Sequence, residues 1–309
     1  QVGRARRIDD APGRYIHAVK QSIPADVRFD ELKVVLDCAN GAAYQVAPSA
    51  IWELGAKLVT IGNAPNGTNI NAGVGSTALG AVKAKVVEVG ADIGLALDGD
   101  ADRVIGVDER GEIVDGDQIM TALALDMKER AALTRNAIVV TVMSNLGLRR
   151  ALSAAGIGIV ETPVGDRNVL VALEEHGLEL GGEQSGHVIV PRLATTGDGL
   201  LTGLLLSDLA VRSGRPVSAL AAQMERFPQV LANVRVAGRP DLAHAAGLWS
   251  EVDAVEAELG DRGRVLVRTS GTEPLVRVMV EAETEHEADL MVGRLKNAVE
   301  IAFPADQTR

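Results

Sequence analysis

The stretch DGDADR, residues 98–103, places Asp98, Asp100 and Asp102 at alternate positions and follows them directly with Arg103. In an extended segment alternate residues share a face, and a bend within the stretch would bring the three carboxylates onto one point. Three such anions repel one another unless a cation neutralises them. Because all-oxygen ligands favour a hard ion, the stretch predicts a Mg²⁺ site, with Mg–O distances of about 2.1 Å and positions left open for a phosphate. The guanidinium of Arg103 could pair with that phosphate.

Two other interpretations of DGDADR account for less of it. A solvated turn with Asx-type hydrogen bonds needs one aspartate rather than three. A calcium-binding EF-hand loop would accept Glu109 at its last acidic position, but Arg103 stands where the sharp bend requires glycine. Both flanks also predict strands, whereas an EF-hand requires helices.

A second candidate is the stretch RTSGTEP, which lies between two predicted strands. Its hydroxyls and closely approachable backbone N–H groups, together with two converging arginines, would form a phosphate cradle. The residues are Arg268, Ser270, Gly271, Thr272 and Arg277. An ordinary hairpin loop stabilised by hydroxyl–backbone hydrogen bonds explains the same stretch equally well, so both interpretations stay open here.

A third candidate is the stretch GGEQSGH, whose glycines allow a tight turn that presents Glu183, Ser185 and His187. A carboxylate beside a hydroxyl suits the hydroxyl groups of a sugar. Polar residues on turns are usually only solvated, so this stretch taken alone does not establish a binding site.

The bulk composition limits the classes of partner. The 309-residue chain has 42 acidic and 31 basic residues and a net charge of −11, which argues against nucleic acid or an anionic membrane. The single cysteine, Cys38, excludes an internal disulfide and fits a reducing compartment. The N-terminus lacks the apolar core of a secretion signal, and the apolar run LLTGLLLSDLAV is too short to span a bilayer. We expect a cytoplasmic protein, and nothing in the sequence indicates its oligomeric state.

Short β-branched runs alternate with helical patterns, which predicts an α/β fold. The pattern of KVVLD, AKLVTIG and ADIGLALD with intervening helices and a following hairpin is repeated by AIVVTVMSN, IGIVETPVG and the pair around GGEQSGH. We therefore expect two tandem three-layer α/β/α domains with mixed sheets, residues 1–114 and 115–225. A small α+β C-terminal domain would follow at 226–309, with a long helix from Asp241 to Leu259, a hairpin, and a closing helix from Glu285 to Phe303.

DGDADR, GEQSGH and RTSGTEP occur in this order, one in each predicted domain, together with DCANGAA, PNGTNIN and VGDR. This combination resembles the α-D-phosphohexomutase superfamily over essentially the whole chain. The resemblance implies that the three aspartates hold Mg²⁺, that Arg103 lines the same site and that His187 lies nearby. It also implies sugar-hydroxyl binding by Glu183 and Ser185, a place at the sugar end of the cleft for Asp166 and Arg167, and binding of the phosphate that is not transferred by the RTSGTEP residues.

GEQSGH and GDR resemble the subgroup that acts on glucosamine phosphates. The implied reaction interconverts glucosamine 6-phosphate and glucosamine 1-phosphate through a phosphoserine and a 1,6-bisphosphate, and feeds UDP-N-acetylglucosamine and cell-wall synthesis. Arg103 and His187 are the two candidates for proton transfer in that reaction.

The family's reactive serine has no counterpart in this sequence, which resembles domains two to four of a four-domain enzyme. We therefore expect an N-terminal phosphoserine domain as a missing partner, and no turnover by this chain alone. Two alternatives stay open: a mutase for mannose or glucose phosphate, and a non-catalytic module that binds sugar phosphates.

Overall fold

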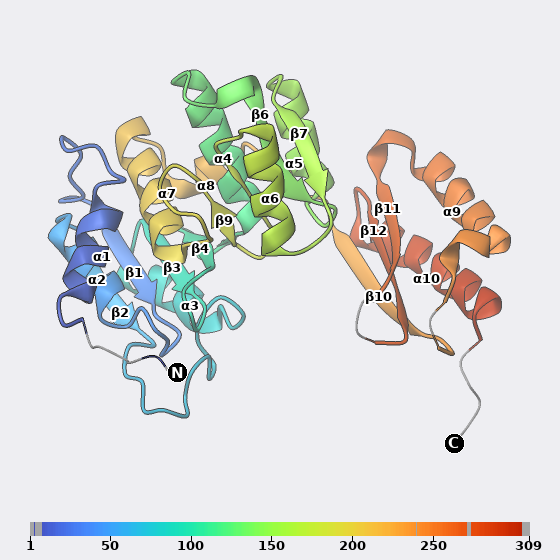
Figure 1. Cartoon of the computed structure of the whole chain (residues 1–309), viewed down its shortest axis with the longest axis horizontal. Coiled ribbons are helices and arrows are strands. Elements are labelled where there is room, and N and C mark those ends of the chain that lie inside the picture. The colour runs from blue at the N-terminus through green and yellow to red at the C-terminus, as the bar shows by residue number, and fades with distance from the viewer. Residues whose placement is uncertain (1–2, 4–7, 239, 271–272, 305–309) are drawn as a thin grey trace. The chain divides into compact units, whose positions relative to one another are not determined.

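The computed structural model describes residues 3, 8–238, 240–270 and 273–304 (Figure 1). Contacts divide the chain into two compact units. The first comprises Gln1–Ser144 and Leu148–Met224, and the second comprises Asn145–Gly147 and Glu225–Arg309.

The first sheet of the first unit has the strand order β2-β1-β3-β4-β5. β1 pairs in parallel with β2 and β3, whereas β4 and β5 are antiparallel, so the sheet is mixed. Parallel pairing requires crossover connections, which here contain helices. The elements are α1 (Ala11–Lys20), β1 (Lys33–Asp37), α2 (Val46–Glu53), β2 (Lys57–Ile61), α3 (Gly80–Val89), β3 (Ile93–Leu97), β4 (Val104–Asp108) and β5 (Ile113–Val114).

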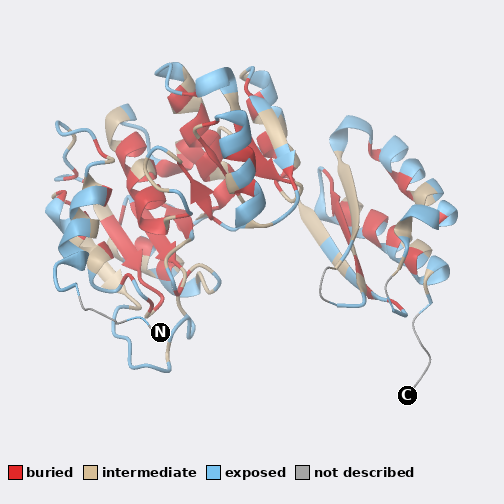
Figure 2. Ribbon diagram, viewed as in Figure 1, coloured by how far each residue is buried: buried red, intermediate tan, exposed pale blue. Residues whose placement is uncertain are grey.

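Helices cover both faces of this sheet because its strands are apolar on both sides. Val34 and Leu36 of β1 pack into a core that also contains residues of α2, whereas Val35 packs on the other face against Val82 and Val86 of α3. Side chains alternate across a strand, so consecutive valines serve opposite layers. Figure 2 shows these central strands as buried and the outer faces of the helices as exposed.

The second sheet has the order β7-β6-β8-β9 and is also mixed, with only β9 antiparallel to its neighbour. α6 covers one face through Val169 and Leu173, and α5 covers the other through Leu148 and Leu152. The elements are α4 (Gly116–Glu129), η1 (Thr134–Asn136), β6 (Ala137–Thr141), α5 (Leu146–Ala154), β7 (Gly158–Thr162), α6 (Asp166–His176), β8 (Gly181–Gly182), β9 (Val188–Ile189), α7 (Gly199–Ser213) and α8 (Val217–Ala221).

One continuous apolar core joins the two sheets of the first unit. It contains Val114 and Ile119, which lie on either side of the predicted 114/115 boundary. The three predicted domain ranges therefore stay a prediction, while the tandem three-layer arrangement with mixed sheets is confirmed.

Two helix starts in this unit are fixed by aspartate caps. Asp115 and Gln118 form a reciprocal capping box at α4, and the Asp198 carboxylate accepts a hydrogen bond from the Leu201 N–H at the start of α7. Such caps satisfy N–H groups that the helix itself leaves unpaired.

The second unit is a three-stranded antiparallel sheet, β10-β12-β11, against which α9 and α10 pack (Figure 1). This confirms the predicted small α+β domain. The elements are β10 (Gln229–Arg235), η2 (Leu242–His244), α9 (Ala246–Leu259), η3 (Gly260–Arg262), β11 (Arg264–Thr269), β12 (Leu275–Glu281) and α10 (Glu285–Ala302).

The predicted helix from Asp241 to Leu259 was too long at its start. The Asp241 carboxylate accepts a hydrogen bond from the Ala243 N–H and caps a short 3₁₀ turn, and the α-helix begins only at Ala246. Among the described residues, no helix combines the length and the apolar character needed to cross a membrane.

Candidate active site

The acidic stretch forms the loop between β3 and β4. Asp98 directly follows β3, and Ala101 adopts a left-handed backbone conformation with φ of 62°. This turn brings one carboxylate oxygen each from Asp98, Asp100 and Asp102 within 4.8 Å of one another. The predicted convergence of the three side chains is therefore present in the fold.

The electrostatics of this loop fit a cation. Burial, then the neighbouring carboxylates Asp102 and Asp100, raise the pKa of Asp98 to about 6. Oδ1 of Asp102 is buried and accepts no hydrogen bond from the residues that the structure describes. A buried anionic oxygen without a hydrogen bond is costly unless a positive charge is placed beside it. These residues could hold a metal ion, since such an ion would satisfy that oxygen and remove the mutual repulsion.

Arg103 compensates this charge only in part. Its Nε lies 3.6 Å from Oδ1 of Asp102 and 4.0 Å from Oδ2 of Asp98, and its side chain is 44% exposed. The loop carries three carboxylates and this guanidinium lies beside two of them, so the loop keeps a negative charge. The exposed part of Arg103 is accessible to a further anion.

The GEQSGH turn lies directly against the acidic loop. The Val104 N–H, at the start of β4, donates a hydrogen bond of 3.2 Å to the Gly186 carbonyl oxygen. Gly186 has φ of 90°, and a Cβ there would lie 2.1 Å from the Val104 oxygen. Only glycine permits both the conformation and this close approach.

His187 joins the turn to the metal-binding candidates. It is 2% exposed, and its Nε2 accepts a hydrogen bond of 3.1 Å from the Gly197 N–H. The proton of the neutral ring is therefore on Nδ1, which donates to Oδ2 of Asp102 at 3.1 Å. Both ring nitrogens are engaged, and the hydrogen bond fixes the orientation of the Asp102 carboxylate.

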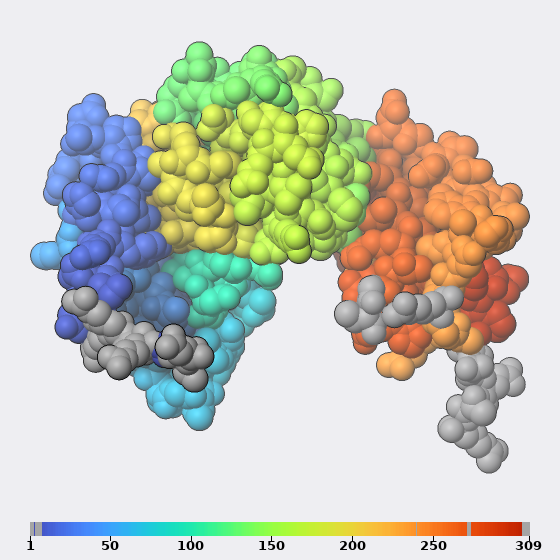
Figure 3. Space-filling model, viewed as in Figure 1, coloured from blue at the N-terminus to red at the C-terminus, as the bar shows by residue number. Residues whose placement is uncertain are grey.

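The other predicted sugar-binding residues also gather here. Oε1 of Glu183 accepts a hydrogen bond of 2.9 Å from the Gly165 N–H, and the Ser185 hydroxyl donates to Oε2 of Glu183 at 3.4 Å. Gly165 immediately precedes α6, whose first residues are Asp166 and Arg167, both exposed. Their helix lies on the surface that faces the viewer in Figure 3. The first unit thus brings the acidic loop, the GEQSGH turn and the start of α6 together.

The second unit holds the arginine pair. Arg268 of β11 lies directly opposite Arg277 of β12. Burial and the nearby charge of Arg277 lower the pKa of Arg268, and Nε of Arg277 is buried with no hydrogen-bond partner in the described part of the chain. Two adjacent guanidinium groups fit an anion, because an anion would relieve their repulsion.

The loop beside this pair is described only in part. The Ser270 N–H donates to the Leu275 carbonyl oxygen at 2.9 Å, and the Ser270 hydroxyl accepts from the Glu273 N–H at 3.3 Å. Gly271 and Thr272 lie outside the described residues. The phosphate-binding role of this loop stays a prediction.

Sequence reasoning missed two residues that support the acidic loop. The Tyr15 hydroxyl donates to both oxygens of the Asp198 carboxylate at 2.9 and 3.0 Å. The next N–H group, of Gly199, donates to the Ala101 carbonyl oxygen at 2.9 Å. Burial, then the charge and the hydrogen bond of Asp198, raise the pKa of Tyr15. The segment GDG at 197–199 could have indicated a tight turn with a cap, but Tyr15 carries no local signal.

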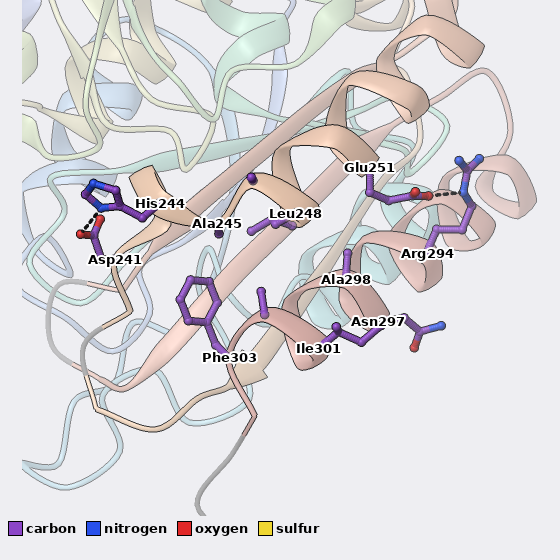
Figure 4. Close-up of a pocket in the computed structure, with 13 residues that line it drawn as sticks. Asp241, His244, Ala245, Leu248, Glu251, Arg294, Asn297, Ala298, Ile301 and Phe303 are labelled. Carbon is purple, nitrogen blue, oxygen red and sulfur yellow. Dashed lines mark hydrogen bonds and ion pairs between the residues drawn. The ribbon is translucent and has the colours of Figure 1, made fainter.

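A cavity of about 710 Å³ in the second unit lies between α9 and α10 (Figure 4). Figure 4 shows the Glu251–Arg294 ion pair at one end and the Asp241–His244 pair at the other, with the aromatic ring of Phe303 in its wall. None of the predicted site residues that the structure describes lines it. The cavity is therefore separate from the candidate active site.

Comparison with known families matches three consecutive segments of the chain. Residues 13–111 match "Phosphoglucomutase/phosphomannomutase, alpha/beta/alpha domain II". Residues 115–227 match alpha/beta/alpha domain III, and residues 231–298 match the C-terminal domain, of the same family. These segments contain the acidic loop, the GEQSGH turn and the arginine pair, respectively.

Comparison with individual curated proteins also identifies sugar-phosphate mutases as relatives. The chain is 53% identical over 302 residues to the phosphoglucosamine mutase of Erythrobacter litoralis, covering 98% of this chain and 67% of that protein. It is 56% identical over 283 residues to the phosphoglucosamine mutase of Zymomonas mobilis, covering 91% and 63%. The chain thus spans about two thirds of the length of the curated relatives it matches.

Among solved structures, Aspergillus fumigatus N-acetylphosphoglucosamine mutase in complex with GlcNAc-6P and magnesium matches with a TM-score of 0.77. The identity is 22%, and the match covers 96% of this chain and 66% of the other, which shows a shared fold. Three family matches in sequence order and relatives above 50% identity establish the kinship: the chain belongs to the phosphoglucomutase/phosphomannomutase family and carries its domains II, III and IV.

Proposed function

We propose that this chain is the metal- and sugar-phosphate-binding part of a phosphoglucosamine mutase, which interconverts glucosamine 6-phosphate and glucosamine 1-phosphate. The observation that carries the proposal is the convergence of three carboxylates within 4.8 Å, with Asp102 hydrogen-bonded to His187 of the GEQSGH turn. The relatives named phosphoglucosamine mutase support the choice of sugar. The single buried cysteine supports a reducing, cytoplasmic location.

The first unit would bind the reacting end of the substrate. Asp98, Asp100 and Asp102 would hold Mg²⁺, whose oxygen-ligand preference fits this donor set. When bound, the ion would neutralise charge on the phosphoryl group during transfer. Arg103, 44% exposed beside these carboxylates, could pair with an oxygen of the same phosphoryl group.

The sugar and the second phosphate would be bound by different elements. Glu183 and Ser185 would hydrogen-bond sugar hydroxyls, with Asp166 and Arg167 at the start of α6 beside them. In the second unit, Arg268 and Arg277 would hold the phosphate that is not transferred. Separate binding of that phosphate would allow either phosphorylated carbon of the sugar to be presented for reaction.

His187 and Arg103 are the two predicted candidates for proton transfer. The two hydrogen bonds of buried His187 support an orienting function for its ring rather than exchange of a proton with the sugar. Arg103 is the more accessible of the two predicted candidates.

The proposal is tested by mutase turnover of this chain alone and of the chain joined to the serine-bearing first domain of a relative. We expect turnover only in the second case, and faster turnover of glucosamine 1-phosphate than of mannose 1-phosphate or glucose 1-phosphate. A preference for mannose would contradict the choice of sugar. Tight sugar-phosphate binding without turnover in the joined protein would instead support a binding module.

A further inference from the structure

Asp37 is a buried carboxylate that the proposed reaction does not use. It is the last residue of β1 and has no exposed surface. Oδ1 accepts a hydrogen bond of 2.9 Å from the Ala39 N–H, and Oδ2 accepts one of 2.7 Å from the Gly75 N–H. One carboxylate therefore joins two loops, residues 38–45 and 62–76.

Both loops contain backbone that needs external support. Ala39, Asn40 and Asn71 adopt left-handed conformations with φ of 54°, 49° and 57°. Such conformations are unfavourable for residues with a Cβ and persist where surrounding contacts hold them. The Asn71 N–H donates to the Ala39 carbonyl oxygen at 2.8 Å, which joins the two loops directly.

The same two loops contact the acidic loop at Gly99, which lies between Asp98 and Asp100. The Ala42 N–H donates to the Gly99 carbonyl oxygen at 2.8 Å. On the other side, a Cβ on Gly99 would lie 2.8 Å from Cδ1 of Ile70. A third link runs from the Ser76 N–H to the Leu97 carbonyl oxygen at 2.9 Å, one residue before Asp98.

We propose that Asp37 is a positioning residue for the metal site: by accepting hydrogen bonds from both loops it holds them against Gly99 and so fixes the spacing of Asp98 and Asp100. This inference rests on the proposed metal site and adds a residue outside it. Neither oxygen of Asp37 belongs to the cluster of converging carboxylates. Its effect would pass through the contacts of the two loops with residues 97 and 99.

The carboxylate is specifically suited to this task. It offers an acceptor oxygen to each of two N–H groups, whereas an asparagine has a single acceptor oxygen and an NH₂ group that cannot accept. Asp37→Asn would therefore leave one of the two loops without its hydrogen bond while changing the volume little. Asp92→Asn is a matched control, because Oδ2 of Asp92 accepts a hydrogen bond of 2.7 Å from the Lys33 N–H at the opposite end of β1.

The test measures Mn²⁺ affinity of the 309-residue chain by calorimetry, with the Mn²⁺ electron paramagnetic resonance spectrum as a second readout. Residues that orient metal ligands typically contribute about 10- to 100-fold in affinity, and we expect a loss in this range for Asp37→Asn. We also expect an altered spectrum, which a purely structural role would not produce. Asp92→Asn should match the unaltered chain in both.

Affinity within about twofold of the unaltered chain for Asp37→Asn would overturn the inference and leave the proposed function standing. Absence of Mn²⁺ binding to the unaltered chain would overturn the proposed function and this inference with it.

Hydrogen exchange of the unaltered chain keeps the inference testable if Asp37→Asn does not fold. Because coupling between sites is reciprocal, Mn²⁺ should slow exchange in residues 38–45 and 62–76 as well as in 98–103. Protection confined to 98–103 would refute the role of Asp37.

Discussion

Two substitutions of His187 separate orientation of the proposed metal ligands from proton transfer. Nδ1 is bonded to the ring's Cγ, as the amide nitrogen of asparagine is bonded to its Cγ, so His187→Asn can keep the donor to Asp102. Nε2 lies one atom further out, where the amide oxygen of glutamine can stand, so His187→Gln can keep the acceptor for the Gly197 N–H. Each variant thus removes one of the two hydrogen bonds of 3.1 Å.

The expected magnitudes follow from the charge of the group that loses its partner. A hydrogen bond to a charged group contributes about 1.5–3 kcal/mol, which corresponds to roughly a 10- to 100-fold change in affinity. His187→Gln loses the bond to the Asp102 carboxylate and should bind Mg²⁺ or Mn²⁺ more weakly by that factor. His187→Asn should bind the ion almost as the unaltered chain does. Both should lower the free energy of unfolding by about 1–3 kcal/mol, because each leaves one buried polar group unpaired.

Calorimetric titration with Mn²⁺, combined with urea unfolding, measures both quantities. Equal losses of metal affinity in the two variants would refute the orienting role. If His187 instead transferred the proton, both variants would abolish turnover in the joined enzyme while metal affinity stayed unchanged.

Further predictions concern the charges and the close packing of the site. Asp100→Asn should weaken Mg²⁺ binding about 10- to 100-fold in calorimetry, while the unfolding free energy changes by less than about 0.5 kcal/mol because Asp100 is exposed. Arg268→Ala should weaken hexosamine phosphate binding about 10-fold or more in a titration and leave the Mn²⁺ affinity unchanged. The pKa of Asp98 is raised from 3.8 to about 6, so the metal-free fold binds a proton more tightly than the unfolded chain does. That stabilisation of the metal-free fold is complete below the unfolded pKa and is lost as the pH rises through about 6. Calorimetry should also show that Mg²⁺ affinity falls as the pH is lowered through the same range, because the ion must displace the proton. Gly186→Ala should lower the unfolding free energy by about 3 kcal/mol or more in urea, because the new Cβ would lie 2.1 Å from the Val104 oxygen at a φ of 90°.

Local patterns in the sequence predicted the fold and the convergence of the acidic triplet. Runs such as KVVLD became strands because they must be apolar on both faces of a covered sheet, and the structure places Val34 and Val35 in two different cores. The triplet Asp98, Asp100 and Asp102 was visible because all its members lie within five consecutive residues. In both cases the sequence pattern and the structural feature that it predicts lie within the same few consecutive residues.

The contacts that organise the site could not be predicted in this way. The hydrogen bond between Asp102 and His187 joins residues 85 positions apart, and that between Tyr15 and Asp198 joins residues 183 apart. Such pairs depend on how the two sheets of the first unit pack, which no local pattern encodes. In the sequence Asp37 is only the last residue of a predicted strand, and its hydrogen bond to the distant Gly75 N–H is found only in the folded structure.

Residues with strained backbone conformations gather at the carboxyl edge of the first sheet, which supports the proposal that this edge binds a ligand. Ala39 and Asn40 follow β1 and Ala101 follows β3, two neighbouring parallel strands, so their left-handed conformations gather where both strands end. Each such residue costs on the order of 1–3 kcal/mol unless its surroundings hold it. In open α/β sheets, ligands bind at this carboxyl edge. Three features at this edge each cost folding free energy: the strained backbone, the buried carboxylate of Asp37 and the repulsion within the acidic loop. A cation bound by that loop would directly offset the repulsion.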